Sequence, residues 1–209
     1  MVKILNLYAG IGGNRKLWGD EHEVTVVENN PDIAKVYQEL FPNDKVIVGD
    51  AHQYLLDHYE EFDFIWSSPP CPTHSRMRLL CHEQEGKTTP YPDMMLYQEI
   101  IFLKHWFKGK WVVENVISYY EPLIKPHKVG NHYYWSNFII SQYREDKRMI
   151  IRMNTDDIII NKSAKFGFNL EGFDVSKSLK VKMLNNAVEP KTALHIFNCA
   201  FKIKQQVLI

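Results

Sequence analysis

Short apolar segments alternate with helical segments through the first half of the chain, and this alternation limits the possible fold more than any other feature. The sequence predicts strands at residues 3–8, 23–28, 45–48, 62–66 and 110–113. Helical segments are predicted between them at residues 14–18, 31–41, 53–59 and 93–107. Strands that alternate with helices predict an α/β fold with a mainly parallel, twisted sheet covered by helices on both faces.

The second half of the chain has a weaker pattern. Residues 133–140 and 148–153 resemble strands, and residues 156–160 form either a strand or the start of a loop element. Pro190 opens a final amphipathic helix. Residues 72–92 are polar, which predicts a loop.

The composition excludes several classes of protein. With 209 residues the chain forms one compact domain, and 25 basic side chains balance 25 acidic ones, so a nucleic-acid site must be a local patch. Three cysteines in no repeating pattern, Cys71, Cys81 and Cys199, indicate a reducing compartment. No signal-like segment opens the chain, and no apolar run approaches the roughly 18 residues that span a bilayer. We expect a soluble cytoplasmic protein without a membrane partner.

Unusual residues lie at the carboxyl ends of the first three predicted strands, where open parallel sheets bind ligands. A glycine turn, Tyr8–Gly13, follows the first strand and can bring backbone N–H groups close to a ligand. Glu28 is placed to accept hydrogen bonds from ribose hydroxyls, and Asp50 from an adenine amino group. Each feature alone is typical of a tight turn or a solvated strand end, but together they predict an adenosine pocket. A nicotinamide enzyme fits this part of the pattern equally well.

The end of the fourth strand separates these alternatives. Dehydrogenases have no Pro-Pro-Cys sequence there, and many amino-directed methyltransferases have Pro-Pro-Tyr, whose ring stacks on the target base. This chain has Pro69, Pro70 and Cys71. A thiol at this position indicates nucleophilic attack in place of stacking.

Five short motifs occur in one order along nearly the whole chain. They are Leu7–Gly13, Pro70–Ser75, Leu96–Ile100, Glu114–Val116, and Asn185–Val188 with Pro190. In these motifs and their order the sequence resembles the DNA (cytosine-5) methyltransferase family. The resemblance implies a Rossmann-like class I methyltransferase fold. It also implies S-adenosyl-L-methionine as the cofactor, S-adenosyl-L-homocysteine as the product, and double-stranded DNA with a flipped cytosine as the substrate.

The resemblance also implies a set of site residues. The catalytic residues are Cys71 and Glu114. The cofactor contacts are Tyr8, Ala9, Gly10, Ile11, Gly12, Gly13, Glu28, Asn29, Asp50, Ala51, Pro70, Leu96, Asn186, Ala187 and Val188. The substrate contacts are Ser75, Arg76, Asn115 and His132. No metal is expected, because the spacing of Cys71, His74, Cys81 and His82 fits no common zinc pattern.

Cytosine chemistry gives the catalytic residues their roles. Carbon 5 is a poor nucleophile until a thiolate adds at carbon 6, so we expect Arg76 and Arg78 to favour the Cys71 thiolate. Glu114, as a carboxylic acid, would donate a proton to nitrogen 3. No residue is identified as the base that removes the carbon 5 proton, and a water molecule would suffice. Residues 72–92 would close behind the flipped base. The alternative for Cys71 is an inert buried thiol, and the alternative for Glu114 is an ordinary acid at the end of a strand.

The sequence departs from the family in two places. The family's Gln-x-Arg-x-Arg motif is missing. Residues 127–135 resemble the shorter His-Arg-x-Arg-Tyr-Phe-Trp form found in the animal de novo enzymes of the family, but Asn131 and His132 stand where an arginine is expected. His132 would hold the cytosine O2 more weakly than a guanidinium group.

The second departure is a short recognition region. We assign residues 1–135 and 184–209 to the catalytic part of one compact domain, and residues 136–183 to a small target-recognition insertion. The insertion contains two clusters of basic side chains, which either bind phosphates or are solvated surface charges. The first is Arg144, Lys147, Arg148 and Arg152, and the second is Lys177, Lys180 and Lys182. Because the insertion is small, we expect the protein to recognise only a short DNA sequence. We also expect a homodimer or a partner subunit that supplies further specificity.

Two other functions stay open at this point. One is an RNA or free-nucleotide cytosine-5 methyltransferase, which would use the same site. The other is a catalytically weak relative that binds DNA or a partner while holding the cofactor. A bacterial or phage origin is expected, and the sequence does not separate restriction–modification, phage protection and regulation.

Overall fold

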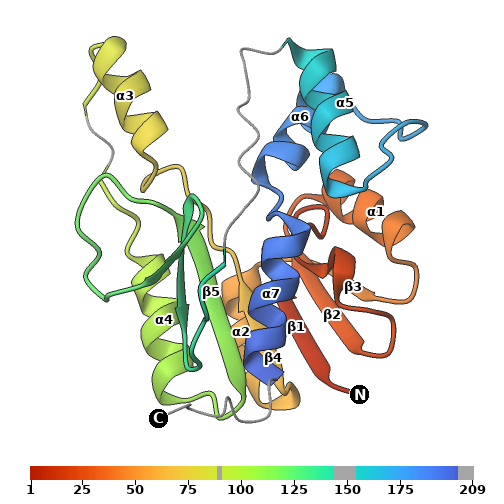
Figure 1. The fold of residues 1–209 in the computed structure, drawn as a ribbon, viewed down its shortest axis with the longest axis vertical. Helices are drawn as coiled ribbons and strands as arrows, with labels where there is room; N and C mark the ends of the chain where they lie inside the picture. The colour runs from red at the N-terminus through yellow and green to blue at the C-terminus, as the bar shows by residue number, and fades with distance from the viewer. Residues whose placement is uncertain (89–90, 144–153, 202–209) are drawn as a thin grey trace.

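The computed structural model describes residues 1–88, 91–143 and 154–201, and these residues form a seven-stranded sheet in the order β3-β2-β1-β4-β5-β7-β6 (Figure 1). The strands are β1 Lys3–Leu7, β2 Glu23–Glu28, β3 Lys45–Val48, β4 Phe64–Ser67, β5 Lys110–Val116, β6 His127–Val129 and β7 His132–Ser136. The first five strands pair in parallel, and β7 is antiparallel to both β5 and β6. The predicted α/β fold with a mainly parallel sheet is confirmed.

Helices cover both faces of the sheet. They are α1 Pro31–Leu40, α2 Ala51–His58, α3 Arg76–Gln84, α4 Met95–His105, α5 Thr155–Phe166, α6 Lys177–Asn186 and α7 Pro190–Phe201, with short 3-10 helices η1 Arg15–Leu17 and η2 Tyr59–Glu61. One core contains side chains of α1 and α7 together with Trp18, which follows η1, and the other contains side chains of α2 and α4. Within the described residues, no helix has the length and apolar character that crossing a membrane requires.

The order of the strands places the site. The chain runs outward from β1 to β2 and β3, and then returns to β4 on the other side of β1. Crevices that bind ligands form at such a switch, outside the carboxyl ends of the strands. In the pairing register Leu7 is opposite Ser67, and Glu28 is opposite Val48. The glycine turn, Glu28, Asp50 and the Pro-Pro-Cys segment therefore leave the sheet at one edge.

Two segments predicted as non-helical are helices. Residues 72–92, predicted as a loop, contain α3, which extends away from the sheet in Figure 1. No α3 residue is buried, so the helix has no apolar stripe that periodicity could reveal. Residues 156–160, predicted as a strand or loop element, lie inside α5. Asn154 caps α5 by accepting a hydrogen bond from the Asp157 N–H, and Gly167 ends it with a φ of +71°.

The strands of the second half also differ from the prediction. The strand predicted at residues 133–140 is shorter, because β7 ends at Ser136, whose hydroxyl donates to the Phe138 carbonyl at 2.7 Å. Strand β6 was not predicted, and it pairs with β7. The strand predicted at residues 148–153 lies outside the described residues, as does the basic cluster from Arg144 to Arg152.

Candidate active site

The glycine turn after β1 packs against the C-terminal motif. A Cβ atom on Gly13 would lie 2.3 Å from the Val188 carbonyl oxygen and 3.0 Å from the Ala187 Cβ. Only glycine allows this approach, because real Cβ atoms do not come so close to a backbone oxygen. The first and last motifs of the sequence are therefore in contact, as the predicted cofactor pocket requires.

Glu28 holds the other side of this turn. Its carboxylate accepts hydrogen bonds from the Gly10 N–H at 3.0 Å and from the Asn30 N–H at 2.9 Å. The φ of Gly10 is +56°, and a Cβ there would meet open space within 4 Å. The backbone at Gly10 is thus open to a ligand, and Glu28 keeps lone pairs for further donors.

A cavity of about 280 Å³ lies at this edge of the sheet. Its lining includes six predicted cofactor contacts, Tyr8, Asn29, Asp50, Ala51, Pro70 and Leu96, and five residues that were not predicted as such, His52, Pro69, His74, Asp93 and Met95. The other predicted contacts, Ala9–Gly13, Glu28 and Asn186–Val188, are not in its lining, and Asn186 is exposed at the end of α6. Asp50 caps α2 by accepting from the Gln53 N–H at 3.0 Å.

Residues 69–75, the segment predicted to carry the nucleophile and called the nucleophile segment below, are held by several hydrogen bonds. The Asn115 side-chain amide donates to the Pro69 carbonyl at 3.0 Å, and its oxygen accepts from the Val116 N–H at 3.0 Å. The His74 and Ser75 N–H groups donate to the Cys71 carbonyl at 3.0 and 3.2 Å. Asn115 is 2% exposed, so it acts on the nucleophile segment; a direct substrate contact stays a prediction.

The resting state of Cys71 differs from the expectation. Burial raises the pKa of the Cys71 thiol above its ordinary value of 9.0, the Glu114 carboxylate raises it further, and Arg78 lowers it by less. Arg78 therefore favours the thiolate, as expected, but its effect is smaller than the opposing effects of burial and Glu114. The Arg76 guanidinium donates from Nε to the Ser118 carbonyl at 2.9 Å, which explains why it does not act on the thiol.

Glu114 and His132 form the neighbouring part of the site. Glu114 is 8% exposed on β5, and His132 begins β7, which pairs with it. The distance from His132 Nε2 to Glu114 Oε1 is 3.6 Å. Two of the predicted residues from separate motifs therefore lie together.

His74 lines the cavity and was not among the predicted site residues. Its Nδ1 lies 2.6 Å from the Tyr120 hydroxyl. Its Nε2 is buried and has no hydrogen-bond partner among the described residues. Burial lowers the pKa of His74, which favours the neutral imidazole. An unpaired nitrogen in the wall of the cavity fits a site that receives a polar ligand.

Comparison with known proteins decides the family. The family profile described as C-5 cytosine-specific DNA methylase matches residues 2–122, which is more than half of the chain. The chain belongs to this family. Membership of the C-5 cytosine-specific DNA methylases supports cytosine methylation with S-adenosyl-L-methionine as the methyl donor, and binding of nucleic acid.

Solved structures similar to this methylase cover almost the whole chain. EhMeth, a methyltransferase of Entamoeba histolytica, has 12% sequence identity and a TM-score of 0.60 over 96% of this chain and 98% of that chain. A mutant of DNMT2 from Spodoptera frugiperda has 15% identity and a TM-score of 0.60 over 97% and 100% of the two chains. At these identities the comparison establishes a shared fold. No curated protein matches the sequence.

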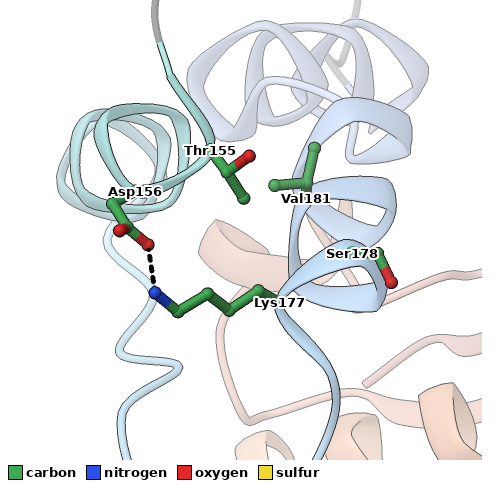
Figure 2. Close-up of a pocket in the computed structure, with 5 residues that line it drawn as sticks. All are labelled: Thr155, Asp156, Lys177, Ser178 and Val181. Carbon is green, nitrogen blue, oxygen red and sulfur yellow. Dashed lines mark ion pairs between the residues drawn. The ribbon is translucent and has the colours of Figure 1, made fainter.

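A second hollow in this methylase lies away from the strand ends, between the first turns of α5 and α6 (Figure 2). It is lined by Thr155, Asp156, Lys177, Ser178 and Val181. The Lys177 Nζ is 2.7 Å from the Asp156 carboxylate, and both side chains are largely exposed. One charge of the predicted basic cluster is therefore paired, and phosphate binding there stays a prediction. Among the described residues no group of three or more His, Cys, Asp or Glu side chains is arranged to hold a metal ion.

The contact between Gly13 and Val188 leads to a stability prediction. We expect Gly13→Ala to lower the free energy of unfolding by about 1–3 kcal/mol, because the new methyl group meets a backbone oxygen that must move. Urea unfolding measures this change. Gly49→Ala is the matched control, since a Cβ there meets nothing within 4 Å. An unchanged unfolding midpoint in Gly13→Ala would contradict the described packing.

Proposed function

We propose that the protein transfers a methyl group from S-adenosyl-L-methionine to carbon 5 of cytosine in double-stranded DNA, through a covalent Cys71 adduct with the target base flipped out. The observation that carries this proposal is the position of Cys71. The thiol follows the Pro69–Pro70 segment in the cavity wall, Asn115 holds that segment, and Glu114 is close enough to act on the thiol. Family membership supports the same chemistry.

The cavity residues suit the cofactor. The open backbone at Gly10 and the spare lone pairs of Glu28 and Asp50 fit an adenosine with a polar tail. We propose that the cofactor contacts are Tyr8–Gly13, Glu28, Asn29, Asp50, Ala51, Pro70, Leu96 and Asn186–Val188, with His52 and His74 added from the cavity wall. When bound, S-adenosyl-L-methionine supplies an electrophilic methyl group and leaves as S-adenosyl-L-homocysteine.

Cys71 and Glu114 share the work at the cytosine ring. The Cys71 thiolate adds to carbon 6, and Glu114 in its acid form gives a proton to nitrogen 3, which relieves the negative charge on the ring. Since the Glu114 charge raises the pKa of Cys71, a neutral Glu114 would favour the Cys71 thiolate. Carbon 5 then accepts the methyl group, after which a base removes the carbon 5 proton and the electrons of that bond expel Cys71 as a thiolate. The proton on nitrogen 3 returns to Glu114, which restores the starting state of the site. We propose Ser75, Arg76, Asn115 and His132 as the residues that position the base.

We propose that DNA reaches this site from the side where α3 projects. Helix α3 begins five residues after Cys71 and exposes Met77, Arg78 and Leu80. Basic and apolar side chains together suit contact with the backbone and the opened base step of a duplex. We propose that α3 packs against the DNA, and that residues 136–183, which include α5 and most of α6, contribute recognition, alone or in a homodimer or with a partner subunit. A cytoplasmic location stays an expectation.

Methyl transfer to three substrates tests the proposal. We expect tritiated methyl groups from S-adenosyl-L-methionine to appear in duplex DNA, and bisulfite sequencing of that DNA to map them to cytosine carbon 5 in a short sequence context. Transfer RNA and dCMP are run in parallel, and Cys71→Ala is the control that must lose the label. Label only in RNA or in dCMP would overturn DNA as the substrate. No transfer to any of them would favour a catalytically weak binding protein.

A further inference from the structure

Glu99 is a buried carboxylate that contacts two residues of the cavity lining and that the proposed mechanism does not use. It lies on α4 and its relative exposure is 0%. The Tyr8 hydroxyl donates to its Oε1 at 2.5 Å, and the Ser67 hydroxyl donates to its Oε2 at 2.6 Å. The Nδ1 of His52 is 3.3 Å from Oε1. Both carboxylate oxygens are thus satisfied by side chains from three other segments.

Each of these three partners belongs to a different part of the site. Tyr8 opens the glycine turn and lines the cavity, and His52 follows Asp50 and Ala51 in the first turn of α2, where it lines the same cavity. Ser67 is the last residue of β4, four residues before Cys71. One carboxylate therefore connects both walls of the cofactor cavity with the strand that carries the nucleophile segment.

We propose that Glu99 is a positioning residue that holds Tyr8, His52 and the end of β4 in the arrangement needed for cofactor binding and for attack by Cys71. This inference rests on the proposed function. Glu99 does not line the cavity itself, so it acts through its partners.

The backbone at Tyr8 supports a positioning role. Its φ is +56°, and it is the one non-glycine among the described residues with a positive φ. A tyrosine keeps this unfavourable conformation only where the surroundings enforce it. The short, charge-assisted hydrogen bond to Glu99 supplies that constraint. Burial and Glu99 also raise the pKa of Tyr8, which keeps its phenol a donor.

The histidine partner gives a spectroscopic signature. The hydrogen bond to Glu99 raises the pKa of His52 above its ordinary value of 6.5, although burial lowers it and the Glu99 and Asp50 charges add to the rise. Bonding at Nδ1 fixes the ring and leaves Nε2 for a ligand. Losing the Glu99 charge should therefore lower the pKa of His52, and a merely structural glutamate elsewhere would not change it.

The decisive variant is Glu99→Gln. A glutamine keeps the size but replaces one oxygen by an NH₂ group, so the Tyr8 and Ser67 hydroxyls, which donate to different oxygens of Glu99, can no longer both donate in this arrangement. We expect the Kd for S-adenosyl-L-homocysteine, measured by calorimetry, to rise about tenfold or more. We expect the His52 titration midpoint, measured by NMR, to fall in the same variant. Asp57→Asn is the matched control, because it removes an exposed carboxylate from the helix of His52 and should change neither quantity.

Two single-partner variants keep the inference testable if Glu99→Gln fails to fold. Tyr8→Phe should mainly raise the Kd for S-adenosyl-L-homocysteine, and Ser67→Ala should mainly slow adduct formation with a 5-fluorocytosine duplex. Equal, wild-type-like behaviour of both variants would overturn the inference. So would a folded Glu99→Gln protein with an unchanged Kd and an unchanged His52 titration. A wild-type protein that binds no S-adenosyl-L-homocysteine would instead overturn the proposed function itself.

Discussion

Replacing Cys71 by serine is expected to slow methyl transfer to duplex DNA by at least about 10³-fold, because a hydroxyl is far harder to ionise than a thiol and adds poorly to carbon 6. A 5-fluorocytosine duplex measures the covalent step directly. The wild-type protein should form an adduct that survives denaturing electrophoresis, since fluorine at carbon 5 cannot leave as a proton. Cys71→Ser should form none, while its Kd for S-adenosyl-L-homocysteine should change little.

Cys81 offers a matched control for this experiment. Its thiol is exposed on α3, whereas Cys71 is partly buried and directly follows Pro69 and Pro70 of the cavity lining. Cys81→Ser should therefore retain the adduct and most of the activity. An adduct that persists in Cys71→Ser would show that another residue is the nucleophile. A wild-type protein that binds the cofactor but forms no adduct would support the catalytically weak alternative.

Replacing Glu114 by glutamine should have opposite effects on catalysis and on the free thiol. We expect methyl transfer to fall about 10²–10⁴-fold, because the acid that donates to nitrogen 3 is lost. Without DNA, however, the Glu114 charge raises the pKa of Cys71, so its removal should increase the thiolate fraction at neutral pH. Alkylation of Cys71 by iodoacetamide should then be faster, by about threefold for each half unit that the pKa falls.

Peptide mass spectrometry over a range of pH separates these effects. In the wild-type protein Cys71 alkylation should rise with pH and have its midpoint at a higher pH than an ordinary cysteine thiol, because burial and Glu114 both disfavour the thiolate. Cys81 is the internal reference in every sample. Glu121→Gln is the control for loss of one negative charge, because Glu121 is exposed and is not among the groups that shift the Cys71 pKa. Slower alkylation in Glu114→Gln would contradict the described electrostatics.

Local sequence signals predicted the sheet and the position of the site. The five parallel strands follow from apolar segments, and the residues after β1, β2, β3 and β4 lie at one edge because the carboxyl ends of parallel strands meet there. The prediction of α3 failed for a physical reason. Periodicity reports an element with one buried face, and no residue of α3 is buried. In α5 three consecutive isoleucines, Ile158–Ile160, favoured a strand, whereas the caps Asn154 and Gly167 define a helix.

The sequence by itself determined the chemistry available to this protein: a thiol after Pro-Pro, a Glu-Asn-Val strand end and a glycine turn. Only the tertiary structure decided how these groups behave. It placed Val188 against Gly13, connected Tyr8, Ser67 and His52 through Glu99, and put Cys71 near Glu114 in partial burial. Contacts between residues distant in sequence, and the pKa values that depend on them, follow from burial and from neighbouring charges. No motif contains that information, because each of these effects depends on segments that only folding brings together.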